Sequence, residues 1–364
     1  MVEQATPPDA VEPEALVVTH WFDSGGEGAA YAATIRLSGL RVGVHGKPGP
    51  KDTFVREEII DGIVPGTGPV SISSWVYGLE PGEWTVHGDV IRSQSDPPGR
   101  EPRNRWSRTT TEPLQRARWS WRRWSVNSVP AAAVKSRWAM LAPLAPIPAV
   151  LPGSFTALGV LAIVAALVVQ AMLLTGTSIP VGQSLVVSAI ATLAGLLGAK
   201  VWYAVLHPGP WPRALLGGWA VDGFLVVAFL AAIFVTPALQ LPTGLFLDAT
   251  APGIFVAVAI GRFGCFFTGC CAGRCTSSRW GIWSSDRRIG ARRIPTQLLE
   301  AAAGLLIAVA SGVLVVNAVL GFSGAIFVAA VAAYFLIRQM LLRLRAERRD
   351  YLWRRSIPMT PAAS

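Results

Sequence analysis

Charged residues are scarce in this sequence. Asp, Glu, Lys and Arg make up only 15% of its 364 residues, whereas soluble globular chains carry about a quarter. Apolar residues reach 52%, and most of the acidic residues precede Pro113. The shortage of charge argues against an ordinary soluble protein and predicts that the later part of the chain lies in a membrane.

No module that reads nucleic acid is visible, although the net charge is +10. The arginines cluster between apolar segments, as in membrane proteins whose basic loops set their orientation. We therefore expect no nucleic-acid partner. Residues 1–16 are acidic and rich in proline, without the basic and apolar segments of a signal peptide, so we expect no cleavable one.

Cysteine is rare as well, and it is confined to one short segment. All four cysteines, Cys265, Cys270, Cys271 and Cys275, lie within residues 265–275. A secreted domain held by disulfides spreads its cysteines along the chain, and a zinc site is typically built on Cys-x2-Cys pairs. Neither pattern is present. Three explanations stay open: packing in apolar surroundings, a redox-active or nucleophilic pair, or a soft metal such as copper(I) or zinc.

Long apolar segments are what the sequence has in quantity. Six of them are long enough to cross a bilayer, at residues 155–174, 180–206, 214–235, 245–267, 296–319 and 322–342. Lys200 and Asp222 fall within these segments, where a charge is costly and often functional. Basic residues flank the spans on alternate sides, a pattern that places both chain ends in the cytoplasm.

The region before the spans has a different pattern. Short alternating segments at residues 15–21, 30–37, 53–60, 70–77 and 83–93 are separated by Gly and Pro, which predicts strands. Residues 79–86 resemble a strand entry of fibronectin type III and related domains. We predict a β-sandwich domain over residues 1–100, either a folded spacer or a site for a protein partner.

Three further regions complete the predicted organisation. Residues 101–150 form a basic, Trp-rich linker that suits a membrane surface. Residues 151–345 form the transmembrane domain, and residues 346–364 a basic tail. The predicted fold class is a mainly α, polytopic membrane protein with about six transmembrane helices and an N-terminal all-β domain.

The segment 259–274 carries the densest pattern of functional residues. Gly261, Gly264, Gly269 and Gly273 remove side chains at the mouth of a span, and Arg262 lies among them. One interpretation is close backbone approach to a phosphate held by a bidentate guanidinium. The other is helix packing by the glycines and an arginine that reaches to the membrane interface.

This segment resembles the signature of bacterial prolipoprotein diacylglyceryl transferases, Gly-Arg-x-Gly-Asn-x-x-Asn-x-Glu-x-x-Gly. Gly261, Arg262, Gly264 and Gly273 match it. Further stretches follow in the family's order at residues 198–203, 216–218, 248–252 and 293–300, and Tyr334 with Arg338 resembles a late Tyr-x-x-x-Arg. The resemblance covers roughly residues 155–345.

The resemblance implies a bacterial plasma-membrane protein that moves diacylglyceryl from phosphatidylglycerol to the thiol of a lipobox cysteine, releasing glycerol phosphate. It implies catalytic roles for Arg262, Tyr334 and Arg338, and no cofactor. The lipid-binding residues implied by it are Lys200, Tyr203, Gly217, Gly218, Gly261, Gly264, Gly273, Gln297 and Glu300. It also implies that the signature loop faces away from the cytoplasm, opposite to the charge pattern.

The sequence departs from the family at residues that handle protons. Leu216 stands in place of a His, and Cys265 and Cys270 in place of Asn and Glu. Thr268, Leu158 and Ile294 replace Asn, Tyr and His. Two alternatives to the transferase therefore stay open: a lipid-binding or complex-assembly subunit, and a thiol-redox or metal-handling membrane protein. For residues 274–293 we expect a solvated cationic loop or a clamp over an anionic head group.

Overall fold

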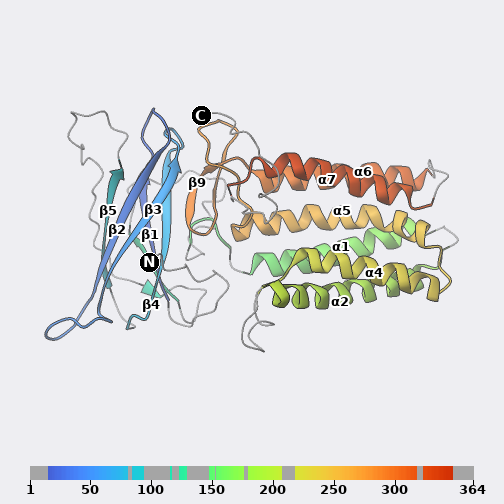
Figure 1. Cartoon of the computed structure of the whole chain (residues 1–364), viewed down its shortest axis with the longest axis horizontal. Helices are drawn as coiled ribbons and strands as arrows, with labels where there is room; N and C mark the ends of the chain where they lie inside the picture. The colour runs from blue at the N-terminus through green and yellow to red at the C-terminus, as the bar shows by residue number, and fades with distance from the viewer. Residues whose placement is uncertain are drawn as a thin grey trace.

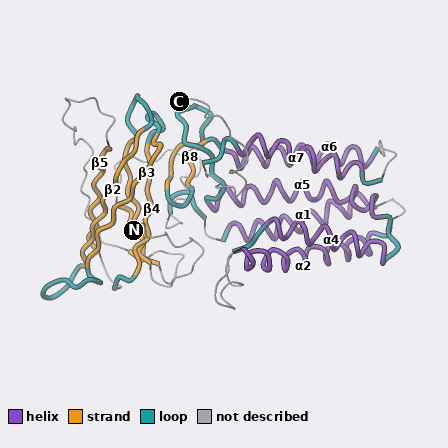
Figure 2. Tube along the Cα trace, viewed as in Figure 1, coloured by secondary structure: helices purple, strands orange, loops and turns teal. Residues whose placement is uncertain are grey.

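The computed structural model describes residues 15–80, 84–93, 115–116, 123–128, 147–151, 153–175, 179–206, 218–317 and 323–346. Two β-sheets stand at one end of a bundle of helices (Figure 1, Figure 2). The predicted fold class, a helical membrane bundle with an N-terminal β part, is confirmed.

Within the described residues, six helices are long and apolar enough to cross a membrane. They are α1 (Ser154–Leu174), α2 (Val181–Leu206), α4 (Val221–Ala238), α5 (Thr243–Thr268), α6 (Thr296–Val316) and α7 (Ala325–Leu342). Each predicted span has its helix. The third begins later than residue 214, because Ala220 is still in an extended conformation.

Small residues let the helices approach one another closely. A Cβ on Gly198 of α2 would stand 2.5 Å from Val227 of α4, and one on Gly253 of α5 would stand 2.5 Å from the carbonyl of Ala166 in α1. Large apolar side chains such as Leu306, 71% exposed, point outward instead. This is the pattern of a bundle packed through small residues and surrounded by lipid.

Several buried polar groups inside the bundle are paired across helices. Gln170 of α1 donates to Thr250 of α5 at 2.7 Å and accepts from Ser188 of α2 at 2.7 Å. Asp248, which belongs to the family-like stretch 248–252, accepts hydrogen bonds from the backbone N–H groups of Gly324 and Phe327 at 2.7 and 2.8 Å. Asp248 thus caps the N-terminus of α7, at the end of the bundle far from the sheets.

The sheets contain every strand predicted before residue 100. A three-stranded sheet has the order β3 (Thr53–Ile63), β2 (Tyr31–Arg41), β5 (Trp84–Ser93). A six-stranded sheet has the order β6 (Gln115–Arg116), β7 (Arg123–Ser128), β1 (Ala15–Asp23), β4 (Pro69–Tyr77), β9 (Ile289–Arg293), β8 (Ile282–Ser285). Strands β6 and β7 come from the segment predicted to be a linker.

The two sheets share one apolar core. Trp84, Ile35 and Ile72 are at most 1% exposed within it. The ring of Phe54 lies 5.8 Å from that of Trp84. Burial of the alternating apolar side chains explains why these segments are strands, since one face of each sheet is shielded from water.

The hairpin β8–β9 was not predicted. It belongs to the connection between α5 and α6, yet β9 pairs antiparallel with β4 of the N-terminal region. Trp283 donates its indole N–H to the carbonyl of Pro69 at 2.9 Å and stacks on Trp21 at 5.3 Å. The prediction of a solvated loop is therefore wrong for this segment, because the connection completes a sheet and ties the sheets to the bundle (Figure 1).

Candidate functional site

The predicted site residues gather at the end of the bundle that faces the sheets. Because successive helices run in opposite directions, the last turns of α5 and α7 meet the first turn of α6 there (Figure 1). Arg262 lies near the end of α5, Glu300 near the start of α6, and Tyr334 and Arg338 in the second half of α7. The hairpin β8–β9 adjoins this end.

Glu300 is the centre of a cluster of arginines. Its side chain is 1% exposed. One carboxylate oxygen lies 2.6 Å from Nε of Arg262 and 3.8 Å from Nη1 of Arg338, and the other lies 2.6 Å from Nη2 of Arg345. Three guanidinium groups thus surround one carboxylate, which leaves an excess of two positive charges in a buried place. Such an excess suits an anionic ligand.

Tyr334 completes the cluster on the α7 side. Its hydroxyl accepts a hydrogen bond from Nη2 of Arg262 at 3.3 Å, and its ring lies 5.6 Å from that of Phe255. The sequence-predicted residues Arg262, Glu300, Tyr334 and Arg338 are therefore neighbours in space.

Arg345 is a site residue that the sequence analysis missed. It lies after the end of α7, where the backbone pairs with the segment that follows α5: Gly273 faces Arg345 in a β-bridge, and Ala346 donates to the carbonyl of Ala272 at 2.9 Å. No motif marked this arginine, because its place depends on that pairing.

The guanidinium of Arg345 is only partly satisfied. Its side chain is 3% exposed, and beyond the bond to Glu300 its Nε and Nη1 have no hydrogen-bond partner among the described residues. Buried donors without partners cost about 1–3 kcal/mol each. They are available to an acceptor that enters the cluster.

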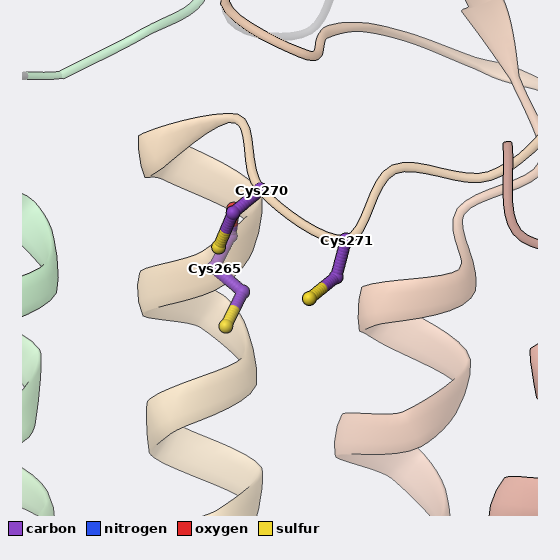
Figure 3. A group of neighbouring side chains, drawn as sticks. All are labelled: Cys265, Cys270 and Cys271. Atoms are coloured by element: carbon purple, nitrogen blue, oxygen red, sulfur yellow. The ribbon is translucent and has the colours of Figure 1, made fainter. Parts of the chain in front are cut away.

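Three cysteines lie beside these arginines, at the end of α5. The sulfurs of Cys265, Cys270 and Cys271 are within 4.8 Å of one another (Figure 3). The helix ends at Gly269 with φ 73°, and the N–H of Cys270 then donates to the carbonyl of Cys265 at 3.0 Å. This glycine-dependent turn folds Cys270 back over the last turn of α5.

The start of α6 holds the cysteine turn in place. The Thr296 hydroxyl donates to the carbonyl of Cys271 at 3.1 Å, and the Gln297 amide donates to the carbonyl of Cys270 at 2.9 Å. Gln297, predicted to bind lipid, is 2% exposed and supports the turn. Nη1 of Arg262 lies 3.9 Å from the sulfur of Cys265, so the arginine and cysteine clusters are in contact.

Cys275 has different surroundings. It forms a β-bridge with Arg293 and packs against the core of the sheets. Burial raises the pKa of its thiol. Arg293 is 2% exposed, pairs with Asp286 at 2.7 Å and donates to the carbonyl of Gly273 at 3.0 Å, so it fixes the hairpin to the cysteine turn.

The signature glycines differ in what they do. A Cβ on Gly273 would stand 2.1 Å from the carbonyl oxygen of Ile294, so this position requires glycine. Gly264 is in ordinary contact with Leu158 and Phe155 of α1 at 3.6 Å. A Cβ on Gly261 would meet nothing within 4 Å. Of these three, only Gly273 is required by the fold; Gly269 is required as well, because its φ is 73° and a Cβ there would stand 2.7 Å from the carbonyl oxygen of Ser285.

The predicted lipid-binding residues of α2 lie in a second group, beside the start of α4. Lys200 donates to the carbonyl of Gly218 at 3.4 Å and stands 4.2 Å above the ring of Trp219. A Cβ on Gly218 would come within 2.8 Å of the Tyr203 ring. Gly217 and Leu216 lie outside the described residues.

The fold and the site together define a multi-pass membrane protein with a buried cationic cluster at one end of its bundle. The family model of prolipoprotein diacylglyceryl transferases matches residues 151–364, more than half of the chain. The chain belongs to this family, and it is therefore a multi-pass bacterial membrane protein.

Individual relatives are similar over shorter stretches. The phosphatidylglycerol–prolipoprotein diacylglyceryl transferase of Chloroflexus aggregans is 31% identical over 100 residues, 26% of this chain and 33% of that protein. The enzyme of the same name from Dehalococcoides mccartyi is 28% identical over 161 residues, 41% of this chain and 60% of that protein. The match to the first of these spans about a third of the relative's length.

Proposed function

We propose that this chain is a phospholipid-dependent membrane transferase that moves a diacylglyceryl group from phosphatidylglycerol to a cysteine thiol, as in lipoprotein biosynthesis. The observation that carries the proposal is the cluster of Arg262, Arg338 and Arg345 around Glu300, in a member of this family. The lipid phosphate is the ligand that this excess of positive charge fits.

The cluster suits the departure of glycerol phosphate. When the carbon–oxygen bond to the lipid phosphate breaks, negative charge grows on the phosphate, and guanidinium groups fixed beforehand stabilise that charge without reorganising. Arg345 contributes the N–H groups that have no partner among the described residues. Tyr334 orients Arg262 through their hydrogen bond.

A transfer assay tests the proposal. Purified chain in phosphatidylglycerol vesicles is incubated with labelled lipid and a lipobox peptide under reducing conditions, and lipid-modified peptide is measured. We expect transfer, and a loss of at least about 100-fold in Arg262→Gln, the size found when a donor that stabilises the transition state is removed. The control Arg279→Gln changes an arginine that lies over Trp280, outside the cluster, and should keep full activity.

The absence of transfer by the native chain would contradict the proposal and favour a second candidate, a lipid-binding or complex-assembly subunit. The observation behind that candidate is Leu216, which stands where the family carries a His. In that case phosphatidylglycerol should still copurify with the native chain, and less of it with Arg262→Gln.

The location of the site and a protein partner are further parts of the proposal. Basic residues flank the sheet-facing end of the bundle, which favours the cytoplasmic side. On that side the acceptor is a thiol exposed to the cytoplasm; on the outer side it is an exported prolipoprotein.

The surface that we propose for binding a protein partner is the edge strand β3, whose Val55 and Ile59 are 62% and 65% exposed.

A further inference from the structure

The three clustered cysteines have the geometry of ligands to a single ion. Their sulfurs, from Cys265, Cys270 and Cys271, lie within 4.8 Å of one another, and all three cysteines are free thiols (Figure 3). Three sulfurs bound to one zinc ion at about 2.3 Å stand about 3.8 Å apart. Small side-chain rotations therefore bring these sulfurs to bonding distance.

A strained backbone conformation at Cys271 holds the three sulfurs close together. Cys271 has φ 55°, a left-handed conformation that residues with a side chain rarely adopt. The conformation turns its side chain back toward α5 (Figure 3), and Thr296 and Gln297 lock it through the carbonyls of residues 271 and 270. Such strain is typical of functional sites, where the surroundings impose it.

The charges around the sulfurs complement a metal–thiolate complex. A zinc ion with three thiolates carries a net charge of −1. Arg262, at 3.9 Å from the sulfur of Cys265, can donate to a bound thiolate, and Arg345 pairs with Gly273 only two residues beyond Cys271. Hydrogen bonds to the ligands from outside the first coordination shell are what orient and tune metal sites.

We propose that Cys265, Cys270 and Cys271 bind one zinc ion with an open fourth position, and that this position takes the acceptor thiol of the transfer reaction. Thiolates are ligands that zinc prefers, and catalytic zinc sites keep three protein ligands and one exchangeable position. The metal site stands on the cysteine geometry alone, whereas its use in transfer rests on the proposed function.

Zinc supplies what the missing His would have done. A thiol bound to zinc loses its proton, which passes to water. The electron pair of the resulting thiolate forms the C–S bond with the glyceryl carbon of the phospholipid. The C–O bond to the phosphate breaks, and its electron pair leaves with glycerol phosphate beside Arg262. Nothing is oxidised or reduced in this step.

Metal analysis of the full chain tests the site. The protein is purified in detergent under reducing conditions, equilibrated with zinc, freed of excess metal and analysed for bound zinc. We expect one zinc per native chain. The affinity for zinc should be at least tenfold lower in each of the variants Cys265→Ser, Cys270→Ser and Cys271→Ser. The matched control Cys275→Ser, at the cysteine that packs against the sheets, should keep it. Equal zinc in all four variants, or none in the native chain, overturns the site.

Cobalt replacement tests the open position separately. Cobalt(II) in the native chain should show thiolate-to-metal absorption bands, and these should shift when a lipobox peptide is added but not when its Cys→Ser version is added. An unchanged spectrum overturns the acceptor role, and bound copper in place of zinc overturns the zinc site. Bound zinc without transfer activity would contradict the proposed function and leave the metal site standing. Transfer by zinc-free protein would overturn the acceptor role of the zinc and leave the proposed function standing.

Discussion

Glu300 is the residue on which the cationic cluster depends. Its carboxylate lies 2.6 Å from both Arg262 and Arg345, and all three side chains are largely buried. Loss of its charge leaves the arginines to repel one another, and removing one partner of a buried ion pair costs about 3–5 kcal/mol. We predict that Glu300→Gln lowers the unfolding temperature by several degrees, measured by thermal unfolding in detergent.

The control for this prediction is an exposed ion pair. Glu57 stands 3.7 Å from Arg36, and both side chains are more than half exposed. Exposed pairs contribute at most about 1 kcal/mol. Glu57→Gln should therefore change the unfolding temperature far less than Glu300→Gln. Equal shifts would show that the buried pairing does not support the fold.

Two signature glycines give a second matched pair at this scale. Gly273→Ala places a methyl group 2.1 Å from the Ile294 carbonyl, where backbone must move, so we predict a clear loss of stability and of folded yield. Gly261→Ala meets nothing within 4 Å and removes a flexible residue from α5, so stability should stay equal or rise by about 0.5–1 kcal/mol. Size-exclusion profiles and unfolding temperatures measure both effects.

His20 makes the stability of the sheets depend on pH. It is 5% exposed, with its ring beside Gly88 of the opposite sheet, and neither ring nitrogen has a hydrogen-bond partner among the described residues. Burial lowers its pKa from 6.5 to about 4, and Asp89 offsets this only in part. The unfolded chain then binds more protons than the folded one between these values, so stability is complete above pH 6.5 and falls as the pH drops toward 4.

The size of this loss follows from the two pKa values. It amounts to about 3 kcal/mol, because each tenfold change in protonation equilibrium is worth about 1.4 kcal/mol. We predict that His20→Leu flattens the dependence of unfolding on pH in this window, followed by tryptophan fluorescence. The variant of an exposed histidine, His45→Gln, should keep the native slope. Identical slopes in all three proteins would refute a buried neutral His20.

The residues of the candidate site were predicted unevenly. Four of them belong to stretches that resemble the family's motifs, and the structure brings these four together: Arg262, Glu300, Tyr334 and Arg338. Arg345 carries no motif, because what places it is the pairing of the chain after α7 with the cysteine turn. The spacing of the cysteines in the sequence also does not predict that three of their sulfurs lie close together, because this depends on left-handed backbone conformations at residues 269 and 271.

At the scale of elements, local pattern predicted the strands before residue 100 and the six spans. Both kinds of element follow from periodicity and from the length of apolar segments. The hairpin β8–β9 did not follow, because its partner strand β4 lies about 200 residues earlier in the chain. The sequence predicted that its arginines are solvated. Arg288, paired with Glu58, is 53% exposed, but Arg293 is only 2% exposed and pairs with Asp286.

The hairpin makes the docking of the sheets testable. Trp283 is 8% exposed, stacks on Trp21 and donates to Pro69, so its loss removes a ring contact and a hydrogen bond between the hairpin and the N-terminal region. Replacing a buried Trp by Ala costs about 3–5 kcal/mol. We predict that Trp283→Ala loosens the sheets and speeds proteolysis near Pro69. Trp280→Ala, at a residue 75% exposed in the same connection, should leave proteolysis unchanged.

In the whole molecule, the sheets, the arginine cluster and the cysteines all lie at the same end of the bundle (Figure 1). A single determination of sidedness therefore locates the site. The connections at the other end, at residues 175–179, 239–242 and 317–321, contain no Lys or Arg, while the sheet-facing end is rich in both. From the positive-inside rule we predict that the sheet-facing end is cytoplasmic.

We therefore predict that green fluorescent protein fused after residue 364 is fluorescent, whereas alkaline phosphatase inserted at residues 239–242 is active, since each reporter works on only one side of the membrane. The family resemblance implies the opposite orientation, so the two outcomes separate two acceptors. Fluorescence at the chain end restricts the site to thiols at the inner leaflet. Alkaline phosphatase that is active when fused after residue 364, and inactive at residues 239–242, would place the site outside, where exported prolipoproteins carry the acceptor cysteine.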